Sequence, residues 1–407
     1  MEEWKTYTAS DFCIKVTDGT HDSPKPKDSG HYLITSKHLK DNCIDFSLAY
    51  RISEEDYQKI IKRSNVVQHD ILFSMIGTIG NIVRITAPIV DFAVKNMAIF
   101  KMGGNELKSK WLYYWLQSPS AKEYIASRLA GSTQAYLTLD SIRQYPISSP
   151  SEVEMKRIVD ILQSIDDKIE LNNRINHNLE QQAQALYKSW FVDFEPFRDG
   201  KFVESELGMI PEGWDAKPLS SICHIEKKTI NPQKHPTCLF THYSIPAYDN
   251  SELPELQKGS DILSNKYIIS DYTILFSKLN PRIKRIWNVY KSESNPICST
   301  EFVVYKPMDI DTYPFLYSFI TGDDFYNNIM SKVNGATGSH QRFHPEETLD
   351  ILVPYHIDCY RLYSQLVLPI IQQIDENKRE NHYFASLRDS LLPKLMSGEL
   401  KINDLTC

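Results

Sequence analysis

The sequence lacks the features that mark most nucleotide-binding and membrane proteins. Only 15 of its 407 residues are glycine, and no GxxxxGK[ST] loop for a triphosphate is present. No run approaches the roughly 20 apolar residues of a membrane-spanning helix, because the most apolar stretch, 70–100, contains Arg84, Asp91 and Lys95. The N-terminus also lacks the basic start and apolar run of a signal peptide. These absences predict a soluble protein of the cytoplasm.

Cysteine chemistry is also sparse. The seven cysteines are an odd number, they are scattered, and no CxxC pair occurs among them. This pattern predicts reduced thiols rather than a disulfide framework. A zinc site could be assembled from His235, Cys238 and His242, but their spacing is not that of a zinc finger. We therefore predict no metal site.

The chain has no excess of positive charge, since 45 Lys and Arg residues face 52 Asp and Glu residues and the net charge is −7. The acidic excess is concentrated in 152–181 and 193–215, so the remainder is close to neutral. Two basic clusters stand out, one at 278–285 and one between Lys25 and Lys40. Such clusters suit contacts with DNA phosphates, and the alternative reading is an ordinary solvated loop.

The sequence repeats itself once. Ile-Leu-Phe-Ser at 71–74 recurs at 274–277, and other pairs follow in the same order at offsets of about 203 to 210. The further pairs are Trp4 with Trp214, 131–134 with 338–341, and 165–166 with 374–375. Collinear pairs at one offset predict a duplicated unit of about half the chain.

The first part of each repeat predicts a mixed α/β globule. Short β-branched and aromatic runs broken by Gly, Pro and Asn are typical of strands. The predicted strands are 32–35, 70–74, 81–86, 267–276 and 301–305, and the predicted helices between them are 110–116 and 314–320.

The second part of each repeat predicts a long helix. A capping-box pattern at 151–154 precedes an unbroken apolar heptad from Ile158, and the second repeat carries a similar heptad, with a helix start or a kink at Pro369. Each stripe covers about five heptads, roughly 50 Å, and each has two Asn in mid-seam. Seam Asn residues favour pairing of the two helices, although packing on the helix's own domain is the alternative. The predicted seam residues are Ile158, Leu162, Ile165, Ile169, Asn172, Asn176, Leu179, Leu186, Ile370, Ile374, Asn377, Asn381, Phe384 and Leu391.

No catalytic residue is predicted. An Asn-Pro-Pro-aromatic or Asp-Pro-Pro-aromatic tetrad of amino-methyltransferases is absent, because Asn231-Pro232, Asn280-Pro281 and Asn295-Pro296 lack the second Pro. Glu226-Lys227-Lys228 resembles part of a nuclease motif but has no preceding Pro-Asp. The sequence therefore predicts a recognition protein rather than an enzyme.

Several motifs together resemble the specificity (S) subunits of type I restriction–modification systems. Residues 18–24, the Ile-Leu-Phe-Ser segment with Gly77 and Gly80, and 131–134 resemble a target-recognition domain. Residues 186–197 and 208–214 resemble the central junction of that family, and 391–400 its C-terminal signature.

The resemblance implies an α+β fold with two mixed α/β target-recognition domains in a pseudo-twofold repeat, separated by two long antiparallel helices that form a coiled coil. The implied partners are double-stranded DNA, two methyltransferase (M) subunits and restriction (R) subunits. S-adenosylmethionine, ATP and Mg²⁺ would belong to those partners, with no cofactor in this chain. The implied segments are target-recognition domain 1 (1–150), the central helix (151–196), a connector (197–213), target-recognition domain 2 (214–356), the C-terminal helix (357–396) and a tail (397–407).

Basic residues would then position the DNA backbone while polar side chains contact base edges. In the first domain the candidates are Thr20, His21, Lys25, Lys27, Lys37, Ser74, Thr133 and Gln134. In the second they are Lys278, Asn280, Arg282, Lys284, Arg285, His340, Gln341 and Arg342. The second domain lacks an Asp-Gly-Thr-His element, so the two domains are expected to read different half-sites.

Two other functions stay open from the residues alone. A coiled-coil scaffold whose globules bind protein would show no salt-dependent binding to DNA. A nuclease acting through the Glu226 region would cleave DNA as an isolated chain with Mg²⁺. A neighbouring reading frame with Asn-Pro-Pro-Phe would instead favour the DNA-reading subunit.

Overall fold

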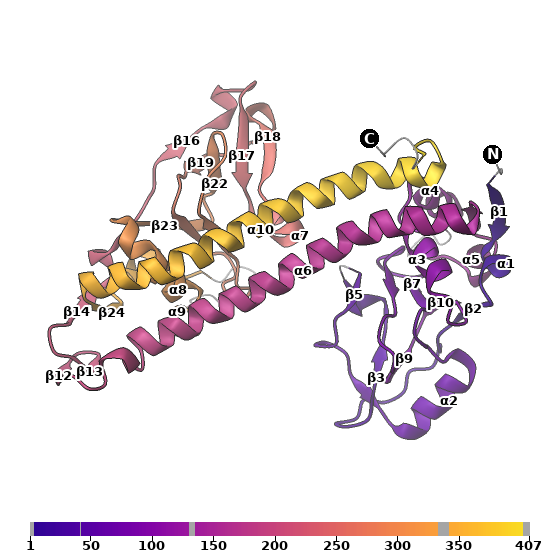
Figure 1. The fold of residues 1–407 in the computed structure, drawn as a ribbon, viewed down its shortest axis with the longest axis horizontal. Coiled ribbons are helices and arrows are strands. Elements are labelled where there is room, and N and C mark those ends of the chain that lie inside the picture. The colour runs from indigo at the N-terminus through magenta and orange to yellow at the C-terminus, as the bar shows by residue number, and fades with distance from the viewer. Residues whose placement is uncertain (1–3, 41, 130–134, 333–341, 402–407) are drawn as a thin grey trace. The chain divides into compact units, whose positions relative to one another are not determined.

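The chain folds into two compact units, and the first of them joins two segments that are distant in sequence. A computed structural model describes residues 4–40, 42–129, 135–332 and 342–401. The first unit consists of Met1–Lys168 with Phe384–Cys407, and the second unit is Ile169–Tyr383. Two long helices, α6 (Glu152–Phe191) and α10 (Ile357–Ser397), each run through both units (Figure 1). The predicted α+β fold with two long helices is confirmed.

The first unit is built on a four-stranded antiparallel sheet with the order β2-β10-β7-β8. A three-stranded sheet, β6-β3-β9, contains one parallel pair, and β1 pairs with β11 and β4 with β5. Its strands are β1 (Lys5–Thr8), β2 (Lys15–Asp18), β3 (His31–Ile34), β4 (Leu39–Lys40), β5 (Cys43–Ile44), β6 (Arg51–Ile52), β7 (Ile71–Ser74), β8 (Ile82–Arg84), β9 (Phe92–Val94), β10 (Met97–Lys101) and β11 (Pro146–Ser149). Its short helices are α1 (Ala9–Phe12), α2 (Glu54–Ser64), α3 (Glu106–Trp115), α4 (Pro119–Arg128) and α5 (Leu139–Arg143).

The second unit has a corresponding four-stranded sheet with the order β15-β23-β20-β21. A five-stranded sheet, β16-β19-β22-β17-β18, again contains one parallel pair, and β14 pairs with β24 and β12 with β13. Its strands are β12 (Phe202–Ser205), β13 (Gly208–Pro211), β14 (Asp215–Pro218), β15 (Cys223–Ile225), β16 (Thr229–Ile230), β17 (Leu239–Tyr243), β18 (Glu255–Lys258), β19 (Lys266–Ile268), β20 (Thr273–Ser277), β21 (Ile286–Val289), β22 (Pro296–Ser299), β23 (Phe302–Pro307) and β24 (Leu352–Tyr355). Its short helices are α7 (Ile245–Ser251), α8 (Tyr313–Thr321) and α9 (Asp323–Ser331).

The internal repeat is visible in the strand order. The two Ile-Leu-Phe-Ser segments form β7 and β20, and each is an inner strand of its four-stranded sheet. The edge strands β2 and β8 of the first sheet correspond in order to the edge strands β15 and β21 of the second sheet. Both segments are fully buried, as inner strands covered on both faces should be.

Local sequence sets the helix starts. At the start of α2 the Ser53 side chain accepts a hydrogen bond from the Asp56 backbone N–H. At the start of α3 the Asn105 side chain accepts one from the Lys108 backbone N–H. Helix α4 begins with Pro119 after Ser118, so the missing proline N–H falls where no helical bond is needed.

The helix pair is antiparallel, because residue numbers rise along α6 as those of the facing residues on α10 fall. In the second unit the amide of Asn172 donates to Asn381 at 2.9 Å, and the amide of Asn377 donates to Asn176 at 2.8 Å. Asn172, Asn176 and Asn377 are nearly fully buried. The Asn residues of the predicted seam therefore face one another, which fixes the register of the pair.

The apolar seam residues continue the contact within each unit. Ile158, Leu162, Ile165 and Ile374 are buried. Ile169, Leu179, Leu186, Ile370, Asn381, Phe384 and Leu391 are half-buried. In the first unit Arg388 of α10 forms an ion pair with Asp166 of α6 at 2.9 Å, and the Tyr114 hydroxyl donates to the same carboxylate at 2.7 Å. The predicted packing of the two long helices is confirmed.

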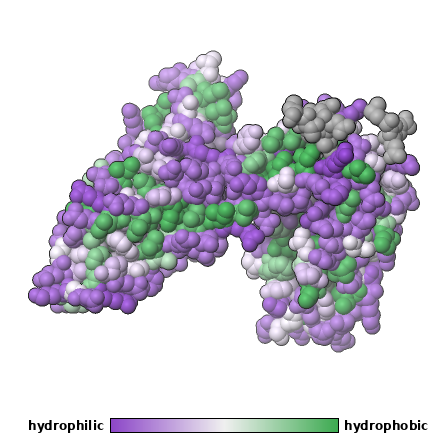
Figure 2. Space-filling view, viewed as in Figure 1, coloured by the Kyte–Doolittle hydropathy of each residue, from purple (hydrophilic) through white to green (hydrophobic). Residues whose placement is uncertain are grey.

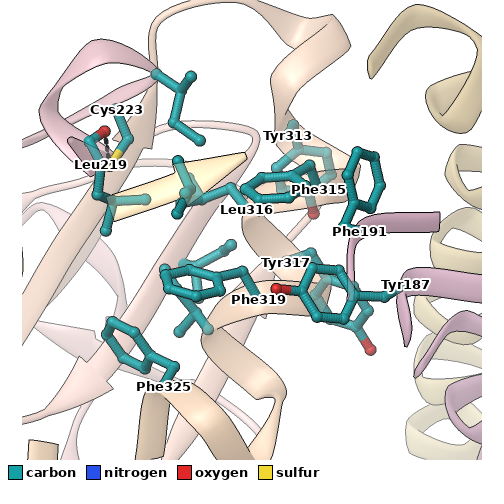
Figure 3. Packing of buried hydrophobic residues seen from close by; sticks show 14 of the residues in the cluster. Tyr187, Phe191, Leu219, Cys223, Tyr313, Phe315, Leu316, Tyr317, Phe319 and Phe325 are labelled. Atoms are coloured by element: carbon teal, nitrogen blue, oxygen red, sulfur yellow. Dashed lines mark hydrogen bonds between the residues drawn. The ribbon is translucent and has the colours of Figure 1, made fainter. Parts of the chain in front are cut away.

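The core of the second unit is rich in aromatic side chains. Figure 3 shows Tyr187 and Phe191 of α6 pointing toward Phe315 and Phe319 of α8. The rings of Phe191 and Phe315 meet edge to face with centroids 4.8 Å apart. Through dispersion and burial, this cluster packs the Tyr187–Phe191 part of α6 against the β-rich part of the unit.

Two local predictions are wrong. The predicted strand 267–276 is two strands in different sheets, separated by a turn in which Tyr272 has φ of 56°. Helix α10 starts at Ile357, so the alternative of a helix start at Pro369 is wrong, and the helix continues through that residue. The apolar pattern of the sequence does not reveal the turn within 267–276. At Pro369 the packing of α10 on the core of the second unit outweighs the backbone hydrogen bond that a proline cannot donate.

Candidate nucleic-acid interface

The loop that follows β2 in the first unit is held firmly at its start. The Thr20 N–H donates to the Val94 carbonyl at 3.0 Å, and the Asn96 N–H donates to the Thr20 carbonyl at 3.1 Å. A Cβ on Gly19 would lie 2.3 Å from the Val94 carbonyl oxygen, so only glycine allows this approach. The residues that follow are therefore presented from a fixed position.

Asp18 connects this loop to helix α2. Its carboxylate is 5% exposed, and it accepts from His21 Nε2 at 2.8 Å and from the Arg63 guanidinium. The other ring nitrogen of His21 lies 2.8 Å from Asn96 Oδ1. The side chains of His21 and Arg63 remain 63% and 60% exposed. A buried carboxylate thus orients two exposed side chains that suit nucleic-acid contacts.

Positive charge surrounds this loop. Lys25, Lys27 and Lys37 of the sequence prediction are all exposed. The Lys59 amine lies 3.8 Å from the Asp22 carboxylate, and the Lys95 amine donates to the Ser23 hydroxyl. The cluster formed by His21, Lys25, Lys27, Lys59, Arg63 and Lys95 is called the β2-loop cluster below.

The sequence analysis missed Lys59, Arg63 and Lys95. Lys59 and Arg63 are four residues apart on α2, opposite the buried face formed by Tyr57 and Ile60. Cations four residues apart lie on the same side of a helix, so this spacing is the sequence pattern from which both residues could have been predicted. Lys95 had none, because only strand pairing brings it beside Thr20.

Two other candidates of the first unit are not available for DNA contact. Ser74 is fully buried, and its hydroxyl accepts from the Asn81 N–H at 2.8 Å and donates to the Thr78 carbonyl. Thr20 is 9% exposed, and its hydroxyl accepts from the Asp22 N–H. Both hydroxyls stabilise turns, so we leave them out of the proposed interface. Thr133 and Gln134 lie outside the described residues.

The basic run of the second unit is partly neutralised by internal contacts. Arg285 is 8% exposed and donates to both carboxylate oxygens of Asp249, at 2.6 and 2.8 Å. The Lys284 amine donates to the Thr321 carbonyl at 2.6 Å and lies 3.7 Å from Asp323. Arg285 therefore forms a buried ion pair within the second unit, and the prediction that it contacts DNA does not hold.

The remaining candidates of the second unit are more accessible. Lys278 and Asn280 are half-buried and Arg282 is exposed, with Asn280 in the left-handed region at φ of 49°. Arg342 is exposed and forms a two-point contact with Glu301 at 3.0 and 3.2 Å. His340 and Gln341 lie outside the described residues.

One histidine of the first unit is held between two carboxylates. The imidazole of His31 contacts Asp91 through Nδ1 and Glu54 through Nε2, and it stacks on Tyr57 with centroids 3.8 Å apart. Desolvation opposes the charged ring, but the hydrogen bonds to Glu54 and Asp91 outweigh it and raise the pKa of His31. The charged form thus ties the first turn of α2 to the sheet.

Within the described parts of the chain, no group of three or more His, Cys, Asp or Glu side chains is placed to hold a metal ion. No helix in those parts combines the length and apolar character that a membrane crossing requires.

Comparisons with known proteins agree on one family. Residues 1–181 match the family described as type I restriction modification DNA specificity domain. The chain is 29% identical to the type I restriction enzyme MjaIX specificity subunit of Methanocaldococcus jannaschii over 73% of this chain and 70% of that protein. It is 24% identical to the HindI specificity subunit of Haemophilus influenzae over 74% of this chain and 80% of that protein.

The fold has a counterpart among solved structures. The S subunit of a type I restriction–modification system from M. genitalium superposes with a TM-score of 0.56 at 16% identity, over 97% of this chain and 96% of that chain. At this identity the likeness concerns the fold, which is that of two β-rich parts with two long packed helices.

Proposed function

We propose that the chain is a specificity (S) subunit of a type I restriction–modification system and that it recognises DNA for such a complex, because residues 1–181 match the type I restriction modification DNA specificity domain and the chain is similar to known specificity subunits. In this proposal residues 1–150 and 214–356 are the two target-recognition domains. Each reads one half of a bipartite, asymmetric site. The complex acts on DNA in the cytoplasm.

The observation that carries the proposal is one scaffold used twice with different loops. The sheets β2-β10-β7-β8 and β15-β23-β20-β21 share their strand order. After β2 the chain continues as Gly19-Thr20-His21, whereas after β15 it continues as Glu226-Lys227-Lys228. Related scaffolds with different side chains at the same sheet edge suit two different half-sites.

The helix pair supports a role as spacer. Helix α6 has 40 residues and α10 has 41, so each is about 60 Å long at 1.5 Å per residue. Both helices are continuous, and the two Asn–Asn contacts set their register. We propose that this pair fixes the separation of the half-sites.

The same helices supply surface for protein partners. Leu171 and Ile175 of α6 and Leu362 and Leu366 of α10 are between 39% and 53% exposed. Figure 2 shows hydrophobic residues along the paired helices. We propose that methyltransferase (M) subunits dock there, and that restriction (R) subunits join through that assembly.

The chemistry of the complex would then lie in its partners. We propose that S-adenosylmethionine is bound by the methyltransferase subunits, and that ATP and Mg²⁺ serve the restriction subunits. This chain would contribute the contacts with DNA and would set the distance between the two half-sites.

Mapping of methyladenine tests the proposal directly. The full chain is produced together with its methyltransferase partner in a host, and a host with the methyltransferase alone is the control. We expect one methylated motif that depends on the chain and has two different halves separated by a fixed gap. A chain-independent motif, or no motif together with no salt-dependent DNA binding, would refute the proposal in favour of a protein-binding scaffold.

A further inference from the structure

We propose that Asp18 is the positioning residue for base recognition by the first unit. The inference deepens the proposed function and depends on it. By accepting from both His21 and Arg63, the Asp18 carboxylate sets the direction in which these two side chains meet the DNA.

The burial of the three residues supports this role. Asp18 is 5% exposed, and a buried carboxylate is stable only with cationic or hydrogen-bonding partners. The side chains of its two partners are mostly exposed, although both ring nitrogens of His21 are already in contact with Asp18 and Asn96. A guanidinium has five N–H donors, and the Asp18 contact is made through Nη2. Arg63 therefore keeps donors for a base edge or a phosphate.

The side chains come from three separate elements, which limits their freedom. Asp18 ends β2, Arg63 lies in the last turn of α2, and Asn96 lies between β9 and β10 with φ of 53°. Because Asn96 Oδ1 holds Nδ1 of His21 while Asp18 holds Nε2, the imidazole plane is fixed on two sides. Held in this way, a side chain loses little entropy when it contacts DNA.

This arrangement is specific to the first unit. Asp18 pairs with Ala98 in the first unit, and when the register of β15 with β23, which ends at Ile225, is continued for two residues, Lys227 takes the corresponding position in the second unit. Lys227 forms an ion pair with Glu346, so the charge at this position is reversed. A single-turn 3-10 helix, Gly259–Asp261, lies between β18 and β19, whereas α2 lies between β6 and β7. A change at Asp18 should therefore affect one half of the recognised site and leave the other unchanged.

The test uses the full chain in complex with its methyltransferase partner. The variants are Asp18→Asn, which removes the charge, and Arg63→Lys, which keeps the charge but loses the planar fork. The control is Asp70→Asn. Asp70 is also a fully buried carboxylate beside a cation, Lys101, but it lies outside the β2-loop cluster.

We expect both test variants to lose discrimination by about tenfold at base pairs of one half-site. Affinity for unrelated DNA should be unchanged or higher in Asp18→Asn, because a negative charge near the DNA is lost. Asp70→Asn should lower thermal stability and keep the motif.

Two results would overturn the inference. In the first, Asp18→Asn methylates the wild-type motif with unchanged discrimination. In the second, both half-sites are relaxed equally, as general damage to the fold would cause. Failure of the wild-type complex to discriminate any sequence would instead refute the proposed function.

Discussion

The buried Asn176–Asn377 contact makes a quantitative prediction about the helix pair. The two side chains are 5% and 6% exposed, and their hydrogen bond is 2.8 Å long. Replacing Asn377 by Leu leaves the Asn176 carbonyl oxygen buried without this donor. The cost of such an orphaned group is about 1–3 kcal/mol. The reciprocal change, Asn176→Leu, leaves the Asn377 amide without its acceptor, and we expect a similar loss.

The double variant should behave differently from the sum of the single ones. With Leu at both positions no buried polar group is orphaned, since Gln373, which donates to Asn377 at 2.9 Å, is exposed, so stability should return to within about 1 kcal/mol of wild type. Urea unfolding followed by the helical circular dichroism signal measures all three variants, and a double-mutant cycle gives the coupling between the two residues.

An exposed residue of the same type provides the control. Asn178 lies two positions along α6 from Asn176 and is exposed, so Asn178→Leu should change stability by less than about 0.5 kcal/mol. Additive losses in the double variant, or single variants as stable as the Asn178 control, would refute the argument that these Asn residues are paired in the seam.

Three further outcomes follow from individual contacts. His31→Gln should be less stable than wild type in acid and should approach wild-type stability as the pH rises. Because the fold raises the pKa of His31, the contribution of His31 to stability is complete below about pH 6.5 and is lost as the pH passes its folded-state pKa. Thermal unfolding between about pH 5 and 9 measures this difference. Replacing Lys25 and Lys27 together by Ala should reduce the salt slope of DNA binding by about 1.8 if both contact phosphates, and an unchanged slope would place them outside the interface. Phe191→Ala should cost about 3–5 kcal/mol in urea unfolding, since its ring is buried among those of Phe315, Tyr360 and Tyr363.

Sequence patterns predicted the features with a strong period or a repeated motif. The heptad stripe marked the helices, and its Asn residues marked the seam, because a buried polar residue in an apolar stripe needs a partner of its own kind. The Ile-Leu-Phe-Ser repeat marked two equivalent inner strands, which the structure places at β7 and β20.

The features that depend on contacts distant in sequence were not predictable in this way. Arg285 lies in a basic run typical of a DNA contact, but Asp249, which is 36 positions earlier, neutralises it. The spacing of Arg63 from Lys59 indicates only that both lie on one side of a helix, whereas the contact of Arg63 with Asp18, 45 positions away, depends on the fold. A single sequence gives the charge of a segment, whereas the partner of each charge depends on the fold.

The repeat combines symmetry in the helix pair with asymmetry in the loops. Asn172 corresponds to Asn377 and Asn176 to Asn381 at an offset of 205, which the buried residues Ile158 and Tyr363 also follow. The predicted pairing of 165–166 with 374–375 is therefore four residues out of register, and each Asn–Asn contact is the counterpart of the other. Such reciprocal pairs are the property of a twofold interface. The sheet edges do not follow this symmetry, since Asp18 in one unit is replaced by Lys227 in the other. The proposed recognition of an asymmetric site would use this combination, because a symmetric helix pair would keep the spacing constant while each set of loops could change independently.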